Sequence, residues 1–146
     1  MTQSRGQRTR HGARQHALQA LYLYQLGGPD FAEMDAWVAE QSPDFDQVYF
    51  ERLVGGIRGR TGELDALFEP YLDRPLNQID LVERAILWIA AFELRYLPEL
   101  DTPIILNEAV QLARDFGAGE SYRYINGVLD RMARSLIERS ASRERV

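Results

Sequence analysis

The sequence predicts an all-α protein, and three observations carry this prediction. Apolar residues recur at spacings of three and four along most of the 146 residues, which is the period of an amphipathic helix. Strand signals are missing, because no apolar–polar alternation is sustained and no Asn-Gly or Asp-Gly turn joins two β-branched runs. Gly and Pro residues fall where the periodic segments end. We therefore expect six helices in two groups of three, that is, two packed three-helix bundles.

The first group is predicted to occupy the N-terminal half. Its first helix ends at Gly27-Gly28-Pro29, and a second, short helix is expected over roughly 31–41. The third begins near Asp46 and runs through an apolar stripe, and the glycines that follow predict a kink or a break before Leu64. The stripe of the first helix comprises Ala13, Ala17, Leu18, Leu21 and Tyr22, and that of the third comprises Tyr49, Phe50, Leu53, Val54 and Ile57.

The second group follows a connector over residues 70–78. The fourth helix opens with Asp80 and Glu83, which have the spacing of a capping box, and it ends before Pro98. For the fifth helix, Thr102 is the expected cap and Pro103 the first helical residue. The sixth starts near Ser121, whose position indicates capping rather than catalysis. Its core stripe comprises Ile125, Val128, Leu129, Met132 and Leu136.

Charge is distributed unevenly along the chain. All 17 basic residues are Arg, and the net charge is −5. Residues 1–29 carry +4, residues 30–130 carry −12 and residues 131–146 carry +3. We expect one domain over 1–146, with a flexible Arg-rich arm at 1–10, helical halves at about 11–72 and 78–138, and a flexible tail at 139–146. Two basic ends on an acidic chain indicate a polyanionic partner or simply two solvated tails.

Composition excludes several classes of function. The chain has no Cys, so it has no disulfides, no thiolate nucleophile and no Cys-based zinc site. His11 and His16 are five residues apart and do not share a helix face as a metal-binding pair would. No run is apolar enough to cross a membrane, and the first residues lack the apolar core of a signal peptide. We therefore expect a cytoplasmic protein that is not an enzyme and uses no cofactor or metal.

Two segments have the composition of a nucleic-acid contact. Arg5, Arg8, Arg10 and Arg14 form a basic string, and the guanidinium group grips phosphate with two hydrogen bonds. The run Ser121-Tyr122-Arg123-Tyr124 places two aromatic rings around an Arg, and unpaired RNA bases stack on such rings.

Six strings, taken in order, resemble the NusB family of bacterial transcription antitermination factors. They are ARQHALQALYLYQL at 13–26, YFERLVGGI at 49–57, PYLDRPL at 70–76, VERAILWIAAFEL at 82–94, PIILNEAVQLARDFGAGES at 103–121 and YINGVLDRMA at 124–133. The resemblance covers nearly the whole chain and implies an all-helical fold of two three-helix bundles. It also implies binding of boxA RNA together with NusE, a ribosomal small-subunit protein, and suppression of termination in ribosomal RNA operons with other Nus factors on RNA polymerase.

The resemblance also implies roles for particular residues. Arg8, Arg10 and Arg14 match the family's RNA-binding arm, and Tyr71 and Tyr124 match its RNA-facing aromatic positions, with Arg123 beside Tyr124. The arm has fewer basic residues than is usual in the family, and Tyr124 stands where Phe is expected. Residues expected to contact NusE are Tyr22 and Glu83. Asn77 and Gln78 replace acids found in some members, and Trp88 replaces an expected basic residue.

Two alternatives remain at this point. One is a helical protein–protein scaffold without RNA affinity. The other is a stand-alone relative of the RNA-binding domain of ribosomal RNA cytosine methyltransferases, whose catalytic domain requires a Cys that this chain lacks. The sequence also raises the question of Asn107 and Asn126. We expect buried amides at packed helix ends rather than direct contacts with RNA, since Asn is a poor helix former.

Overall fold

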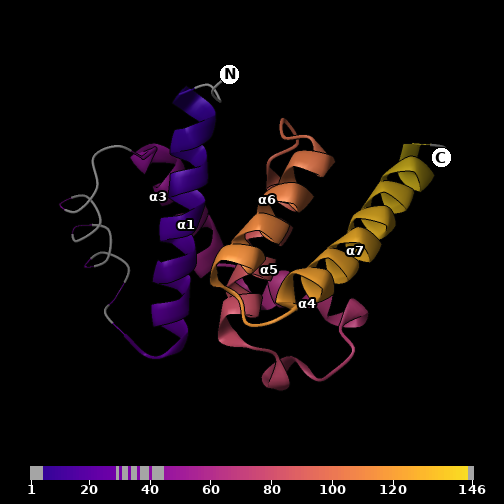
Figure 1. Cartoon of the computed structure of the whole chain (residues 1–146). Coiled ribbons are helices and arrows are strands. Elements are labelled where there is room, and N and C mark those ends of the chain that lie inside the picture. Colours follow the sequence, from indigo (N-terminus) through magenta and orange to yellow (C-terminus); the bar gives the residue numbers. More distant parts are fainter. Residues whose placement is uncertain are drawn as a thin grey trace. The chain divides into compact units, whose positions relative to one another are not determined.

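The computed structural model describes residues 5–28, 30, 33, 36, 40 and 45–144, with side chains from residue 10 to residue 142 (Figure 1). The described residues form α-helices and short 3-10 turns and no β-strand, so the predicted all-α class is confirmed. None of the described helices is long and apolar enough to span a lipid bilayer. The helix expected over 31–41 lies outside the described residues, apart from isolated positions.

The chain divides into two compact units at Thr61/Gly62, ahead of the connector that the sequence suggested as the boundary. The reason is a set of hydrogen bonds between α4 (Thr61–Phe68) and α5 (Leu81–Tyr96). Asp65 of α4 accepts two hydrogen bonds from the Arg84 guanidinium, at 3.2 and 2.6 Å, and one from the indole N–H of Trp88, at 2.8 Å. These bonds tie α4 to the second unit. They also account for Trp88, which is buried as the donor to a buried carboxylate.

In the first unit, α1 (Arg5–Gln25) packs against α3 (Gln47–Arg58). α3 begins at the predicted Asp46, whose carboxylate accepts a hydrogen bond from the backbone N–H of Tyr49. Gly12 allows the segment before α3 to approach α1, because a Cβ atom there would lie 2.9 Å from the Cβ of Phe45. The buried residues of α1 are Ala13, Arg14, Ala17, Leu18, Ala20 and Leu21, and the whole predicted stripe of α3 is buried.

Both ends of the described chain are more helical than the sequence suggested. α1 begins at Arg5, so residues 5–10 of the expected arm are helical, and α7 (Ser121–Glu144) continues through residues 139–144 of the expected tail. No Pro lies between residues 5 and 25 or between residues 121 and 144, so nothing in either segment removes a helical hydrogen bond. The predicted end of α1 is correct: Gly27 adopts φ 75°, and the N–H of Gly28 donates to the carbonyl of Leu23.

The second unit contains α4, α5, α6 (Thr102–Phe116) and α7, with two 3-10 turns, η1 (Glu69–Tyr71) and η2 (Leu76–Gln78), in the connector. Residues 85–93 of α5 are all buried, which makes α5 the most deeply buried helix of the unit. α6 packs against both α5 and α7, and the tight turn between α6 and α7 depends on glycine. A Cβ atom at Gly117 would lie 2.6 Å from the carbonyl oxygen of Ala113.

The predicted helix starts are partly confirmed. The capping box of α5 is present, with Asp80 accepting from the N–H groups of Val82 and Glu83, while Glu83 accepts from the N–H of Asp80. The prediction for α6 was wrong by one residue: Asp101 occupies the cap position, and Thr102 is the first helical residue. The predicted break before Leu64 is present, because α3 ends at Arg58 and α4 begins at Thr61.

Candidate nucleic-acid interface

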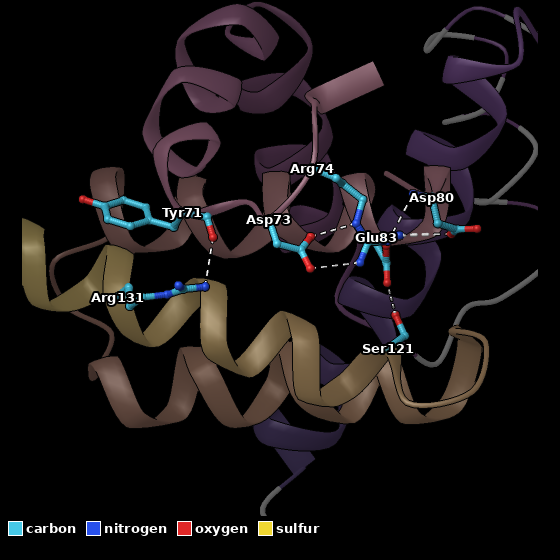
Figure 2. Close-up of polar contacts among 7 residues, drawn as sticks. All are labelled: Tyr71, Asp73, Arg74, Asp80, Glu83, Ser121 and Arg131. Carbon is cyan, nitrogen blue, oxygen red and sulfur yellow. Dashed lines mark hydrogen bonds and ion pairs between the residues drawn. The ribbon is translucent and has the colours of Figure 1, made fainter. Parts of the chain in front are cut away.

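Tyr71 and Arg131 join the connector to α7. The Arg131 guanidinium donates to the backbone carbonyl of Tyr71 at 2.9 Å, and its Nε–H donates to the carbonyl of Gly127 at 3.1 Å. The bond to Tyr71 spans 60 residues and uses only the backbone of that residue. Figure 2 shows the half-buried Tyr71 ring directed away from Asp73 and Arg74. The ring of this predicted RNA-facing residue therefore lies apart from the side chains of Asp73 and Arg74.

Arg74 connects the same segment to Tyr124. Its guanidinium donates two hydrogen bonds to the Asp73 carboxylate, at 2.8 and 3.3 Å, and its Cζ atom lies 4.6 Å from the centre of the Tyr124 ring. The hydrogen bond from Arg74 holds the pKa of Asp73 below its ordinary value, and the same carboxylate raises the pKa of Arg74. This pair was not among the predicted contacts, although both residues lie in PYLDRPL, one of the strings that carry the family resemblance.

The hydroxyl of Tyr124 lies in a buried position. It makes no hydrogen bond of good geometry with any described residue. Burial raises the pKa of Tyr124, and the negative charge of Asp73 raises it further, because both disfavour the phenolate. Tyr124 is therefore half-buried, with a buried hydroxyl and one ring face covered by a cation.

A second aromatic ring, that of Tyr122, has two guanidinium groups close to it. The Cζ atom of Arg114, on α6, lies 4.6 Å from the centre of the Tyr122 ring, and that of Arg123 lies 5.7 Å from it. Arg123 also donates to the Tyr122 hydroxyl at 3.2 Å and forms an ion pair with Glu120 at 3.6 Å. Both Arg side chains are exposed. The predicted run therefore forms a cationic surface, which Arg114 extends.

Glu83, for which the resemblance implies a NusE contact, lies in a buried polar environment, and that contact stays a prediction. It is only 8% exposed, and its two carboxylate oxygens have different partners. One accepts from the backbone N–H of Asp80 at 3.3 Å, and the other accepts from the Ser121 hydroxyl at 2.7 Å (Figure 2). Ser121 was expected to cap its helix but is the first helical residue of α7, and its hydroxyl donates to Glu83. Glu83 thus ties the start of α5 to the start of α7.

The first unit holds the predicted basic string. The backbone of Arg8 is helical, but its side chain lies outside the described residues. Arg10 is exposed, with its Cζ atom 5.0 Å from the centre of the Tyr49 ring. Arg14 lies over the same ring at 5.4 Å but is only 3% exposed. A buried guanidinium beside Tyr49 gives no support to the RNA contact predicted for Arg14, which stays a prediction.

Tyr22 is 36% exposed near the end of α1, which contradicts its assignment to the core stripe. The neighbouring Leu23, Tyr24 and Leu26 are exposed as well. An exposed Tyr22 is compatible with the protein contact predicted for it. Asn107 and Asn126 are exposed as well, so the prediction of buried amides was wrong.

Comparisons with known proteins show which family this chain belongs to. The sequence model of the NusB family matches residues 11–134. The chain belongs to the NusB family. It is 45% identical over 128 residues to the transcription antitermination protein NusB of Nitrosococcus oceani, covering 87% of this chain and 86% of that protein. With NusB of Alkalilimnicola ehrlichii the identity is 41%, covering 92% of this chain and 86% of that protein.

Solved NusB structures share this fold. One is a crystal structure of the antitermination factors NusB and NusE in complex with double-stranded RNA. The likeness to it has a TM-score of 0.76 at 26% identity and covers 88% of this chain and 98% of that one. The expected family resemblance and helical fold are thus confirmed. The roles of individual residues in RNA or NusE binding stay predictions.

Proposed function

We propose that this NusB-family protein is an RNA-binding transcription antitermination factor. In this role it binds boxA RNA of ribosomal RNA operons together with NusE, and it acts in the bacterial cytoplasm with other Nus factors on RNA polymerase. The observation that carries the proposal is the pairing of guanidinium groups with tyrosine rings on the second unit, at Arg74–Tyr124 and around Tyr122. Such surfaces bind single-stranded nucleic acid through phosphate contacts and base stacking.

We assign RNA contact to Arg123, Tyr124 and Tyr71 on the second unit. On the first unit we assign it to Arg8 and Arg10 of α1 but not to the buried Arg14. Contact with NusE is assigned to the exposed Tyr22. Glu83 contributes indirectly, because it fixes the start of the helix that carries Tyr124.

The proposal is tested by binding of a fluorescently labelled single-stranded boxA RNA, followed by anisotropy, in the presence and absence of purified NusE. A scrambled RNA of the same composition is the matched control. We expect tighter binding of boxA than of the scrambled RNA, and a further gain in affinity when NusE is present. Binding of NusE without any RNA affinity would instead support the protein–protein scaffold. Equal affinity for the two RNAs would contradict recognition of boxA.

Tyr22→Ala provides a separate test of the partner surface. Because Tyr22 is exposed, we expect weaker binding of NusE with an unchanged melting temperature and unchanged affinity for RNA alone. Unchanged NusE binding would remove Tyr22 from the proposed interface.

A further inference from the structure

Asp73 and Arg74 form a pair whose partners are adjacent in sequence and exposed to solvent. The side chains of Asp73 and Arg74 are 61% and 42% exposed, and their two hydrogen bonds are those of a bidentate carboxylate–guanidinium pair. Exposed pairs of this kind contribute little to stability. The pair can therefore open and close without cost to the fold.

The pair covers an aromatic surface. With its Cζ atom 4.6 Å from the ring centre, the Arg74 guanidinium occupies the layer that a base would take on that face of Tyr124. A base can stack on this face only after Arg74 has moved. Carboxylate and phosphate groups both accept two hydrogen bonds from a guanidinium group, so an RNA phosphate can replace Asp73 as the partner of Arg74.

We propose that Asp73 is a positioning residue that sets the RNA affinity of this surface by holding Arg74 over the Tyr124 ring in the free protein. RNA opens the pair: a phosphate takes the guanidinium from Asp73, and a base takes the uncovered ring face. This inference rests on the proposed function, because it supposes that single-stranded RNA occupies this surface.

Simple charge repulsion makes a different prediction. An exposed aspartate anywhere near bound RNA lowers affinity through its negative charge, and this effect does not require Arg74. In our proposal Asp73 acts through Arg74, so the effect of removing the carboxylate must depend on the guanidinium.

The test is a double-mutant cycle of Asp73→Asn and Arg74→Gln, with affinity for the boxA RNA measured by anisotropy. We expect Asp73→Asn to raise affinity about two- to fivefold, which is the range expected for freeing an exposed ion pair. In the Arg74→Gln background the same change should keep at most the smaller gain that comes from removing charge repulsion. Asp101→Asn is the control for the loss of one negative charge away from the surface, because Asp101 is exposed, makes no side-chain cap bond and lies at the opposite end of α6 from the turn into α7.

A second readout follows the pair without measuring affinity. The NMR resonance of the Arg74 Nε–H group should shift on Asp73→Asn and should shift again when RNA is added to the wild type. The melting temperature of Asp73→Asn should equal that of the wild type, because both side chains are exposed.

Each outcome decides the proposal. An equal gain from Asp73→Asn with and without Arg74, or no gain in a wild type that binds RNA, overturns the role of Asp73 and leaves the proposed function intact. A wild type that binds no RNA overturns both. A gain that is larger in proteins that retain Arg74 supports the proposal.

Discussion

Replacement of Glu83 by Ala is expected to destabilise the second unit substantially. The change removes a hydrogen bond from the Ser121 hydroxyl to a charged group, which is worth about 1.5–3 kcal/mol, and leaves that hydroxyl buried. It also removes the long, 3.3 Å hydrogen bond of the capping box from the Asp80 N–H to Glu83. A negative charge at the start of α5 is lost as well, and such a charge contributes about 0.3–1 kcal/mol. The free energy of unfolding should therefore fall by about 2–3 kcal/mol.

Urea denaturation followed by circular dichroism measures this loss, with Glu83→Gln and Ser121→Ala as companion variants. The glutamine keeps one acceptor oxygen, so it should lose less than the alanine. The double variant Glu83→Ala/Ser121→Ala should be more stable than the sum of the single losses predicts, because both single changes break the same bond. A Glu83→Ala protein within about 0.5 kcal/mol of the wild type, which is the usual range for a surface site, would refute the structural role and return Glu83 to the predicted NusE contact.

Three further predictions follow from the same structure. Trp88→Phe should lower the free energy of unfolding by about 2–4 kcal/mol, because it removes the indole donor to Asp65 and leaves a cavity; unfolding as in the wild type would show that this bond is dispensable. The Arg8→Ala/Arg10→Ala protein should show a dependence of RNA affinity on salt that is flatter by up to about 1.4 in slope, since each phosphate contact on single-stranded RNA contributes about 0.7. Arg60→Ala is the control for charge, and an unchanged slope in the double variant would remove α1 from the RNA site. Tyr124→Phe should be as stable as the wild type at pH 7, since it removes a hydroxyl without a good hydrogen bond. Because the pKa of Tyr124 is raised in the fold, the unfolded chain loses this proton first as the pH rises through about 10, so the wild type should lose stability there more steeply than Tyr124→Phe. Parallel urea midpoints at pH 9 and pH 10.5 measure the difference, and parallel losses would contradict the raised pKa.

The helices were predictable because their signals are local. The capping box of Asp80 and Glu83, the glycine stop after α1 and the apolar stripes of α3 and α7 each depend on residues close in sequence. The start of α1 was misplaced because a charged, polar segment can be an arm or a helix, and composition alone does not distinguish them.

The site was predictable only in part, because its contacts join residues far apart in sequence. The basic run at Arg123 was visible, but the arrangement of Arg74 over Tyr124 spans 50 positions and follows from how the connector packs on α7. Glu83 and Arg14 were assigned through the family resemblance, which carries no information about burial in this chain. Only the structure reveals that Glu83 accepts from Ser121 and that Arg14 is buried beside Tyr49.

The affinity of Tyr124→Ala for boxA RNA, measured beside its stability, tests the RNA-binding account most directly. Loss of a stacked base should weaken binding by about 1–3 kcal/mol, whereas Tyr124→Phe, which keeps the ring, should bind almost as the wild type does. The half-buried position of Tyr124 predicts a stability loss smaller than the roughly 3–5 kcal/mol of a fully buried aromatic residue. A Tyr124→Ala protein that binds boxA RNA like the wild type but unfolds easily would contradict the account and make Tyr124 a core residue.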